Sequence, residues 1–161
     1  RRNSTSAYFA PAAELLDAGH PLEILLSPTD KPQPPAVGYL LARSELNIAT
    51  WVHKGLVDAG VMSSIDWDNP LRMPPAFKDD MRVIARTAAF PRALEFVRGD
   101  LDPAVKARLR ELLLQASSDP DARDAMLGFF MTTPFLPLED EALDAFDRLD
   151  KGVQRVRTEV E

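Results

Sequence analysis

Residues 45–62 read ELNIATWVHKGLVDAGVM, a helical pattern that ends at a glycine and gives way to a short apolar run. Ser44 precedes this stretch in the manner of a helix N-cap, so we expect a helix over residues 45–54 that stops at Gly55. Residues 57–62 then predict a short strand. Helices that alternate with short apolar strands are typical of a parallel or mixed sheet covered by helices, and we therefore predict an α/β fold.

A second helix is predicted near the start of the chain. Residues 6–18 place apolar side chains on one side at helical spacing, and Gly19 is a natural stop. Pro11 lies inside this pattern and leaves two alternatives open. Either the helix kinks there, or residues 4–10 form a tight first turn and Pro11 lies near the real start of the helix.

Further strands and loops are expected on both sides of these helices. Residues 23–26 are a short apolar run, and two more strands are predicted over residues 82–87 and 93–97. The proline-rich stretch at residues 28–37 cannot be regular structure and predicts a loop. Residues 63–80 also contain several prolines and are expected to be irregular.

The last third of the chain is predicted to be helical. Asp102-Pro103 and Asp119-Pro120 each combine an N-cap aspartate with a proline suited to the first helical position. Acidic residues 139–141 mark a third helix start, where the helix dipole favours negative charge, and Gly152 interrupts the apolar stripe that follows. Two sets of residues predict buried faces: Val105, Leu109, Leu112 and Leu113, and then Leu138, Ala142, Phe146, Leu149, Val153, Val156 and Val160.

Composition excludes several classes of protein. The 161 residues are 45% hydrophobic, enough for one domain with a real core. The net charge of −6 argues against a nucleic-acid partner, because such proteins carry clustered Lys and Arg. The absence of cysteine excludes disulfides and thiolate chemistry and suits cytoplasm and periplasm equally.

No stretch approaches the ~18 apolar residues of a membrane span. If the protein is exported, we expect its signal or lipoprotein anchor to lie outside this sequence.

The sequence offers little that would support catalysis. Its two histidines, His20 and His53, lie in a turn and near a helix end, and neither is spaced as part of a nucleophile–base set. The spacings of zinc sites and EF-hands, and the glycine-rich motifs that bind nucleotides, are also absent. We therefore expect no catalytic residue, no metal and no cofactor, and a chain that holds a small solute rather than transforming one.

Ser4, Thr5 and Ser6, hereafter the hydroxyl run, stand just before the first predicted helix. A helix N-terminus offers unpaired backbone N–H groups and the positive end of the helix dipole, and neighbouring hydroxyls add donors. Together these groups can hold an oxyanion without a positive side chain. The alternative is that one of the three hydroxyls is simply an N-cap, which is common at this position.

Three segments follow one another in an order that resembles a known family. They are Asn3-Ser4-Thr5-Ser6-Ala7-Tyr8 with Pro11 and Leu15–Gly19, then Gly55-Leu56-Val57-Asp58-Ala59-Gly60-Val61, and then Arg82-Val83-Ile84, Pro91, Phe96-Val97-Arg98 and Asp100–Pro103, extended by Asp119–Arg123. Their order and spacing resemble the phosphonate/phosphite/phosphate family of periplasmic solute-binding proteins, which serve ABC importers. The resemblance runs over roughly residues 3 to 150.

The resemblance implies a periplasmic-binding-protein-like fold of type 2, in which two α/β lobes, each a mixed sheet flanked by helices, enclose a ligand. On this basis residues 1–90 are the second, ligand-binding lobe. Residues 91–161 are the returning hinge strand and the C-terminal helices that belong with the first lobe. The opening strands and helices of the first lobe have no counterpart in this sequence.

The resemblance also implies a site. In the family the Ser-Thr-Ser run binds phosphoryl oxygens, which assigns that role to the hydroxyl run, with Tyr8 in the same motif; Ala7 replaces the usual glycine. The family often has a histidine at the next helix start, where this chain has Glu45. A carboxylate repels a dianion unless it turns away or is protonated, or unless the ligand carries a positive or neutral group there. Glu45 also fits an ordinary first-turn glutamate.

The function that the resemblance implies is solute binding for an ABC importer. The ligand is expected to be a small oxyanion such as a phosphonate, phosphite or phosphate, bound between lobes that close around it and are then recognised by the membrane permease. We expect a periplasmic monomer. The main alternative is a ligand-sensing domain of a regulatory or sensor protein with the same fold, and a less favoured one is an enzyme on a similar two-lobed fold.

Overall fold

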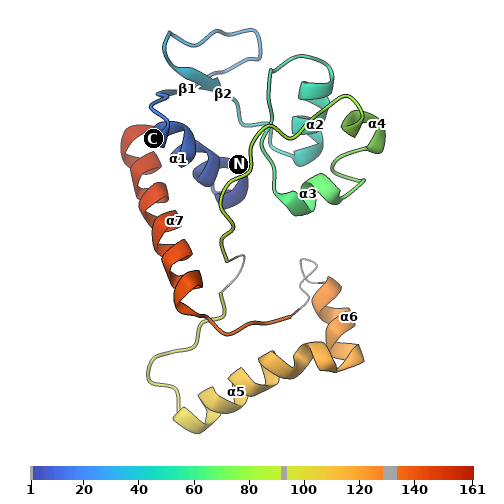
Figure 1. Cartoon of the computed structure of the whole chain (residues 1–161), viewed down its shortest axis with the longest axis vertical. Coiled ribbons are helices and arrows are strands. Elements are labelled where there is room, and N and C mark those ends of the chain that lie inside the picture. The colour runs from blue at the N-terminus through green and yellow to red at the C-terminus, as the bar shows by residue number, and fades with distance from the viewer. Residues whose placement is uncertain (1, 92–93, 129–133) are drawn as a thin grey trace. The chain divides into compact units, whose positions relative to one another are not determined.

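The computed structural model describes residues 2–91, 94–128 and 134–161. These residues form a helix-rich α/β fold with a small sheet (Figure 1). The chain divides into two compact units. The first contains Arg1–Ala89 together with Asp147–Glu161, and the second contains Phe90–Phe146. The segments that carry the predicted site therefore all belong to the first unit.

The chain opens with a helical segment in two parts. Its first turn, η1 (Thr5–Phe9), is a π-helix, and it runs directly into α1 (Ala10–Asp17). Pro11 lies in the first turn of α1, where its missing N–H costs little. The second alternative for Pro11 is thus confirmed, except that the separate first turn is wide rather than tight.

The end of α1 is closed by the glycine that the sequence predicts. Gly19 adopts a φ of +82°, a conformation that L side chains rarely take. The N–H of His20 donates to the Leu15 carbonyl at 2.9 Å, and the N–H of Gly19 donates to the Leu16 carbonyl at 3.0 Å. This pair of bonds is a Schellman cap, which satisfies the last carbonyls of the helix.

The sheet of the described residues has two parallel strands, β1 (Leu22–Ile24) and β2 (Val37–Tyr39). Leu22 pairs with Val37 and Ile24 with Tyr39. The predicted strand at 23–26 is confirmed with a shift of one to two residues. No local pattern in the sequence predicts β2. This strand follows directly after the proline-rich loop and is defined by its pairing with β1.

The middle of the first unit is helical. Ser44 caps α2 (Glu45–His53) by accepting from the Asn47 N–H at 3.2 Å, and Gly55 follows with a φ of +64°. Both ends agree with the prediction. The region expected to be irregular holds two short helices, α3 (Ser64–Asp68) and α4 (Pro75–Lys78).

The predicted strand over residues 57–62 is wrong. No strand is present among these described residues, and the chain passes along the side of α2 instead. A Cβ at Gly60 would lie 2.5 Å from Ile48 Cγ2 and 3.0 Å from Val52 Cγ2. The chain therefore approaches a helix at Gly60 instead of joining a sheet, and periodicity alone does not distinguish such a segment from a buried strand.

The strand predicted at 82–87 is also wrong, and none is present at 94–97 either; Ala93 lies outside the described residues. Both segments are non-helical, and a β-strand needs a hydrogen-bonded neighbour. Their apolar side chains are largely solvent-exposed, with Ile84 at 73% and Phe96 at 81%. These segments thus have the apolar pattern that favours strands, but no strand of the described residues pairs with them.

The second unit contains α5 (Pro103–Gln115), η2 (Ala116–Ser118) and α6 (Pro120–Gly128). The predicted caps are confirmed: Asp102 accepts from the Ala104 N–H at 2.8 Å and Asp119 from the Ala122 N–H at 3.0 Å. The buried face expected on α5 is wrong for this chain, because Val105, Leu109 and Leu112 are about half exposed and no described element covers them.

The core of the first unit lies between α1 and the long last helix, α7 (Asp140–Glu159) (Figure 1). Val156 is fully buried there, with Val153 and Val160 packed beside it, so the C-terminal half of the predicted stripe is confirmed as a core face. Leu138 and Phe146, earlier in the stripe, are about half exposed. The remaining core residues are Tyr8, Phe9, Ala12, Ala13 and Leu16.

Candidate functional site

The hydroxyl run lies where the sequence places it, at the start of the first helical segment. Ser4 is the N-cap, and its Oγ accepts from the Ala7 N–H at 3.1 Å. The Ser4 carbonyl accepts from the N–H groups of Tyr8 and Phe9, each at 3.1 Å. All three hydroxyl residues are partly buried. Ser4 therefore does act as a cap, as the simpler of the two interpretations predicts.

Capping leaves donors in place at this end of the helix. The Oγ of Ser4 uses a lone pair to accept from Ala7, so its hydroxyl hydrogen remains a donor. The N–H groups of Thr5 and Ser6 lie in the first turn, where the helix itself supplies no acceptor. These groups and the Thr5 and Ser6 hydroxyls are the chemistry that an oxyanion needs, and the cap fixes their backbone.

Tyr8 is a core residue. Its side chain is buried, its ring lies 5.6 Å from the ring of Tyr39, and the two hydroxyl oxygens are 3.4 Å apart. Burial, and then the Tyr39 hydroxyl, raise the pKa of Tyr8 well above its usual range. The phenol is therefore neutral and fixes the helix beneath the hydroxyl run. Direct contact between Tyr8 and a ligand stays a prediction.

Glu45 is the first residue of α2 and forms an ion pair with Arg72, whose Nη1 contacts Glu45 Oε2. The Nε of the same guanidinium lies 3.8 Å from Asp66 Oδ1 in α3. The carboxylate that the resemblance places at the site thus has a cation beside it. Arg72 is a residue that the sequence analysis missed, because it lies 27 positions away and no local pattern connects the two.

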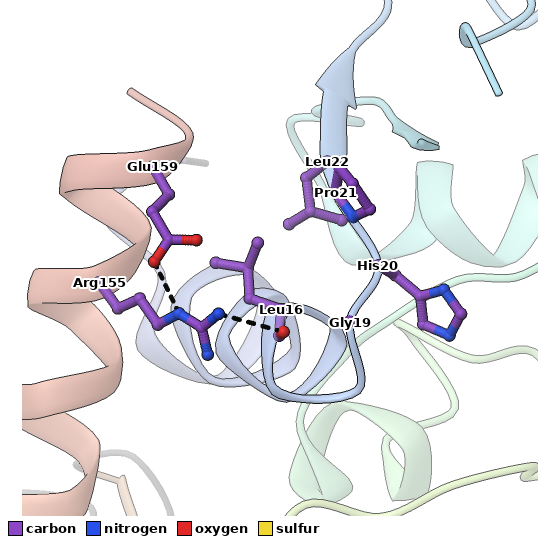
Figure 2. Close-up of a pocket in the computed structure, with 7 residues that line it drawn as sticks. All are labelled: Leu16, Gly19, His20, Pro21, Leu22, Arg155 and Glu159. Atoms are coloured by element: carbon purple, nitrogen blue, oxygen red, sulfur yellow. Dashed lines mark hydrogen bonds and ion pairs between the residues drawn. The ribbon is translucent and has the colours of Figure 1, made fainter. Parts of the chain in front are cut away.

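A surface pocket of about 240 Å³ lies at the opposite end of α1 from the hydroxyl run. Arg155 is part of its lining. The Arg155 Nη2 donates to the Leu16 carbonyl at 3.2 Å, and its Nε donates to Glu159 at 2.8 Å (Figure 2). The His20 ring points away from this guanidinium (Figure 2). None of the predicted site residues lines this pocket. Its lining consists of Leu16, Gly19, His20, Pro21, Leu22, Arg155 and Glu159.

His53 has a structural role. Its ring stacks on Phe77 at a centroid distance of 4.1 Å, and its Nδ1 lies 3.1 Å from Asp80 Oδ2. These contacts hold the end of α2 against α4. Over the described ranges, no three His, Asp or Glu side chains are grouped closely enough to hold a metal ion.

Comparison with known proteins identifies the class of this chain. The family model for phosphonate-binding proteins, described as "ABC transporter, phosphonate, periplasmic substrate-binding protein", matches residues 1–143. The chain belongs to this family of solute-binding proteins of ABC transporters. Among the helices of the described residues, none is long and apolar enough to cross a membrane.

Two solved structures are similar to the chain. XAC2383 from Xanthomonas citri bound to a chloride ion has a TM-score of 0.88 and 49% sequence identity, over 99% of this chain and 58% of that one. XAC2383 bound to ATP has a TM-score of 0.87 and 50% identity, over 98% of this chain and 57% of that one. The chain thus spans less than three fifths of the length of these relatives. No curated protein matches it.

Proposed function

We propose that this chain is the ligand-binding part of the solute-binding component of an ABC importer, and that it binds a small oxyanion through the hydroxyl run. The observation that carries the proposal is the capped start of the first helical segment. Ser4 fixes the turn, and the hydroxyls and first-turn N–H groups of Thr5 and Ser6 supply several donors in a few residues.

We further propose the two-lobed, type 2 architecture of periplasmic binding proteins, with residues 1–90 as the second lobe and residues 91–161 as the hinge return and helices of the first. Support comes from the exposed apolar side chains of residues 82–87 and 94–97, hereafter the connecting segments, and of α5, which lack cover among the described residues. Contiguous exposed apolar patches mark interaction surfaces. The greater length of the XAC2383 chains is consistent with a further part of the fold that covers them.

The mechanism on this proposal is binding without chemistry. The two lobes close about their hinge around the anion, and the closed form is the one that a membrane permease recognises. No bond is made or broken, so the site needs hydrogen-bond donors and a fixed backbone rather than a nucleophile or a base. The family description places such proteins in the periplasm, and we propose that location for this chain.

The ligand class is a compound with a tetrahedral phosphoryl group. Phosphate, phosphite and phosphonates share this group with the triphosphate of ATP, to which XAC2383 has been solved bound. Oxyanions of this kind accept several short hydrogen bonds at once, which suits a cluster of hydroxyl and main-chain donors. The same donors suit a free phosphonate and the terminal phosphoryl group of a nucleotide, so the experiment must separate the two.

A thermal-shift panel on the longest natural form of the protein tests the proposal. The ligands are phosphate, phosphite, methylphosphonate, aminoethylphosphonate and ATP, with sulfate as a tetrahedral anion without phosphorus. A ligand at a hundred times its dissociation constant adds about 2.7 kcal/mol to the free energy of unfolding. We expect a rise in Tm with at least one phosphoryl compound. A panel in which none of them raises Tm contradicts the proposal, and a rise with ATP alone assigns the site to nucleotides.

A further inference from the structure

The last helix places an arginine beside the turn that carries the hydroxyl run. The guanidinium carbon of Arg157, in the last turn of α7, lies 5.5 Å from the centre of the Phe9 ring. Phe9 is the last residue of η1, and its N–H donates to the Ser4 carbonyl at 3.1 Å. Arg157 therefore contacts the turn that Ser4 begins, although the two residues lie near opposite ends of the sequence.

The direction of the Phe9 side chain places Arg157 toward the start of this helical segment. Phe9 has helical backbone angles, with a φ of −64° and a ψ of −49°. Side chains of a right-handed helix tilt toward its N-terminus and cover the preceding turn, which here begins at Thr5. The ring is buried and thus fixed. The guanidinium that rests on it consequently lies on the side of Phe9 that faces the hydroxyl run.

The two arginines near the end of α7 have different partners. The Arg155 Nη1 contacts Asp17, and its Nη2 donates to the Leu16 carbonyl at 3.2 Å. Its Nε donates to Glu159 at 2.8 Å, so every nitrogen of this guanidinium has a partner (Figure 2). Within the described part of the chain, by contrast, no carboxylate lies within ion-pair distance of Arg157. The charge of Arg157 is therefore not neutralised by a described neighbour.

Charge explains why this position matters for an anion. The chain has a net charge of −6, so its overall field opposes an approaching anion. The hydroxyl run offers only neutral donors and the partial charge of a helix N-terminus. A guanidinium keeps its full charge at every physiological pH. The last turn of a helix favours a cation in any case, which explains the sign of Arg157 but not its place on Phe9.

We propose that Arg157 is a specificity-determining residue of the anion site, which supplies the positive charge that the hydroxyl run lacks. The inference rests on the proposed function, because it needs the anion to lie at the hydroxyl run. Phe9 holds the guanidinium in place through the face of its ring. The attraction is electrostatic and reaches the anion through space, so it should weaken as salt is added.

Calorimetry on the longest natural form of the protein tests this, with inorganic phosphate and methylphosphonate as probes. Arg157→Met keeps an apolar stem against Phe9 but removes the charge, and it should weaken binding by about fivefold at low salt. Arg157→Lys keeps the charge and should bind within about twofold of wild type. Arg148→Met is the matched control, because it removes an exposed arginine earlier in α7 that has no described contact with η1. It should leave the Kd unchanged.

Salt dependence distinguishes an electrostatic role from a structural one. Between about 0.1 M and 1 M salt the Debye length falls from about 10 Å to about 3 Å. The difference in Kd between wild type and Arg157→Met should therefore shrink to less than about twofold at the higher concentration. A deficit of Arg157→Met that salt does not reduce would show a structural effect and overturn the inference, and so would equal affinities at low salt.

The outcomes also separate the two proposals. If the wild type binds neither probe, the proposed function fails and the inference falls with it. If the wild type binds and Arg157→Met binds equally well, only the inference fails. Binding that Arg157→Met weakens but Ser4→Ala/Thr5→Ala/Ser6→Ala leaves intact would overturn both, because the anion would then lie away from the hydroxyl run. Should Arg157→Met not fold, Arg157→Gln takes its place and should show the same loss at low salt.

Discussion

Gly152 in α7 lies so close to Ala13 in α1 that a Cβ at position 152 would be 2.9 Å from the Cβ of Ala13. Real Cβ atoms do not approach so closely, so the backbone of α7 lies directly against the Ala13 side chain at this point. The glycine that interrupts the apolar stripe in the sequence is therefore part of the helix contact. It allows the buried residues on either side of it to reach the α1 core.

Gly152→Leu should lower the free energy of unfolding by roughly 1–3 kcal/mol, the usual cost of overpacking a closed core. The measurement is a urea titration monitored by circular dichroism. Gly128→Ala in α6 is the matched control, because a Cβ there meets no atom within 4 Å, and it should be neutral or slightly stabilising. Equal effects of the two substitutions would contradict the close contact of α1 with α7.

Ser4→Asp separates the capping role of Ser4 from its proposed binding role. Aspartate is as good an N-cap as serine and its charge suits the helix N-terminus, so the free energy of unfolding should stay within about 0.5 kcal/mol of wild type. The added carboxylate should repel an oxyanion and weaken its binding by about a hundredfold. Ser4→Ala should instead cost about 1 kcal/mol of stability. Undiminished phosphate binding by Ser4→Asp would mean that the anion lies elsewhere.

The raised pKa of Tyr8 predicts that the folded chain loses stability at high pH. Burial raises its pKa in the folded chain, so the unfolded chain releases the phenolic proton first, above about pH 10. Stability should therefore be full below that pH and should fall as pH rises beyond it, because there the folded state binds more protons. Tyr8→Phe should reduce this fall between pH 9 and 11, as measured by urea titrations. The same slope in both proteins would show that Tyr8 ionises freely.

Phe96 tests the proposed cover over the connecting segments. If another part of the fold covers it in the longest natural form, Phe96→Ala should cost about 3 kcal/mol of unfolding free energy. A side chain that stays exposed should cost less than about 0.5 kcal/mol. Leu26→Ala is the control, because Leu26 is almost fully exposed in the loop after β1 and should be near neutral. A small cost at Phe96 would argue against the two-lobed assignment.

The helix ends were predictable because they are encoded locally. Ser44, Asp102 and Asp119 each accept from N–H groups two or three residues later, and Gly19 and Gly55 supply the positive φ that closes a helix. A cap depends on four or five consecutive residues, so a sequence pattern is enough to find it.

The strand β2 and the ion pair at Glu45 were not predictable in the same way, because both depend on partners far along the chain. β2 exists through its pairing with β1, across the proline-rich loop, while the more apolar run at 57–62 approaches α2 at Gly60 and forms no strand. The hydroxyl run was found from its residue types, but Arg72 was not, since nothing near it in the sequence points to Glu45.

The measurement that tests the central claim most directly is calorimetric titration of the best phosphoryl ligand into wild type and into Ser4→Ala/Thr5→Ala/Ser6→Ala. The matched control is Ser117→Ala/Ser118→Ala in η2, which removes hydroxyls from the second unit. Each lost donor to a charged oxygen is worth roughly 1.5–3 kcal/mol, so the triple variant should bind at least a hundredfold more weakly. The control should bind as wild type does. Equal affinity of the triple variant and wild type would contradict the assignment of the anion site to Ser4, Thr5 and Ser6.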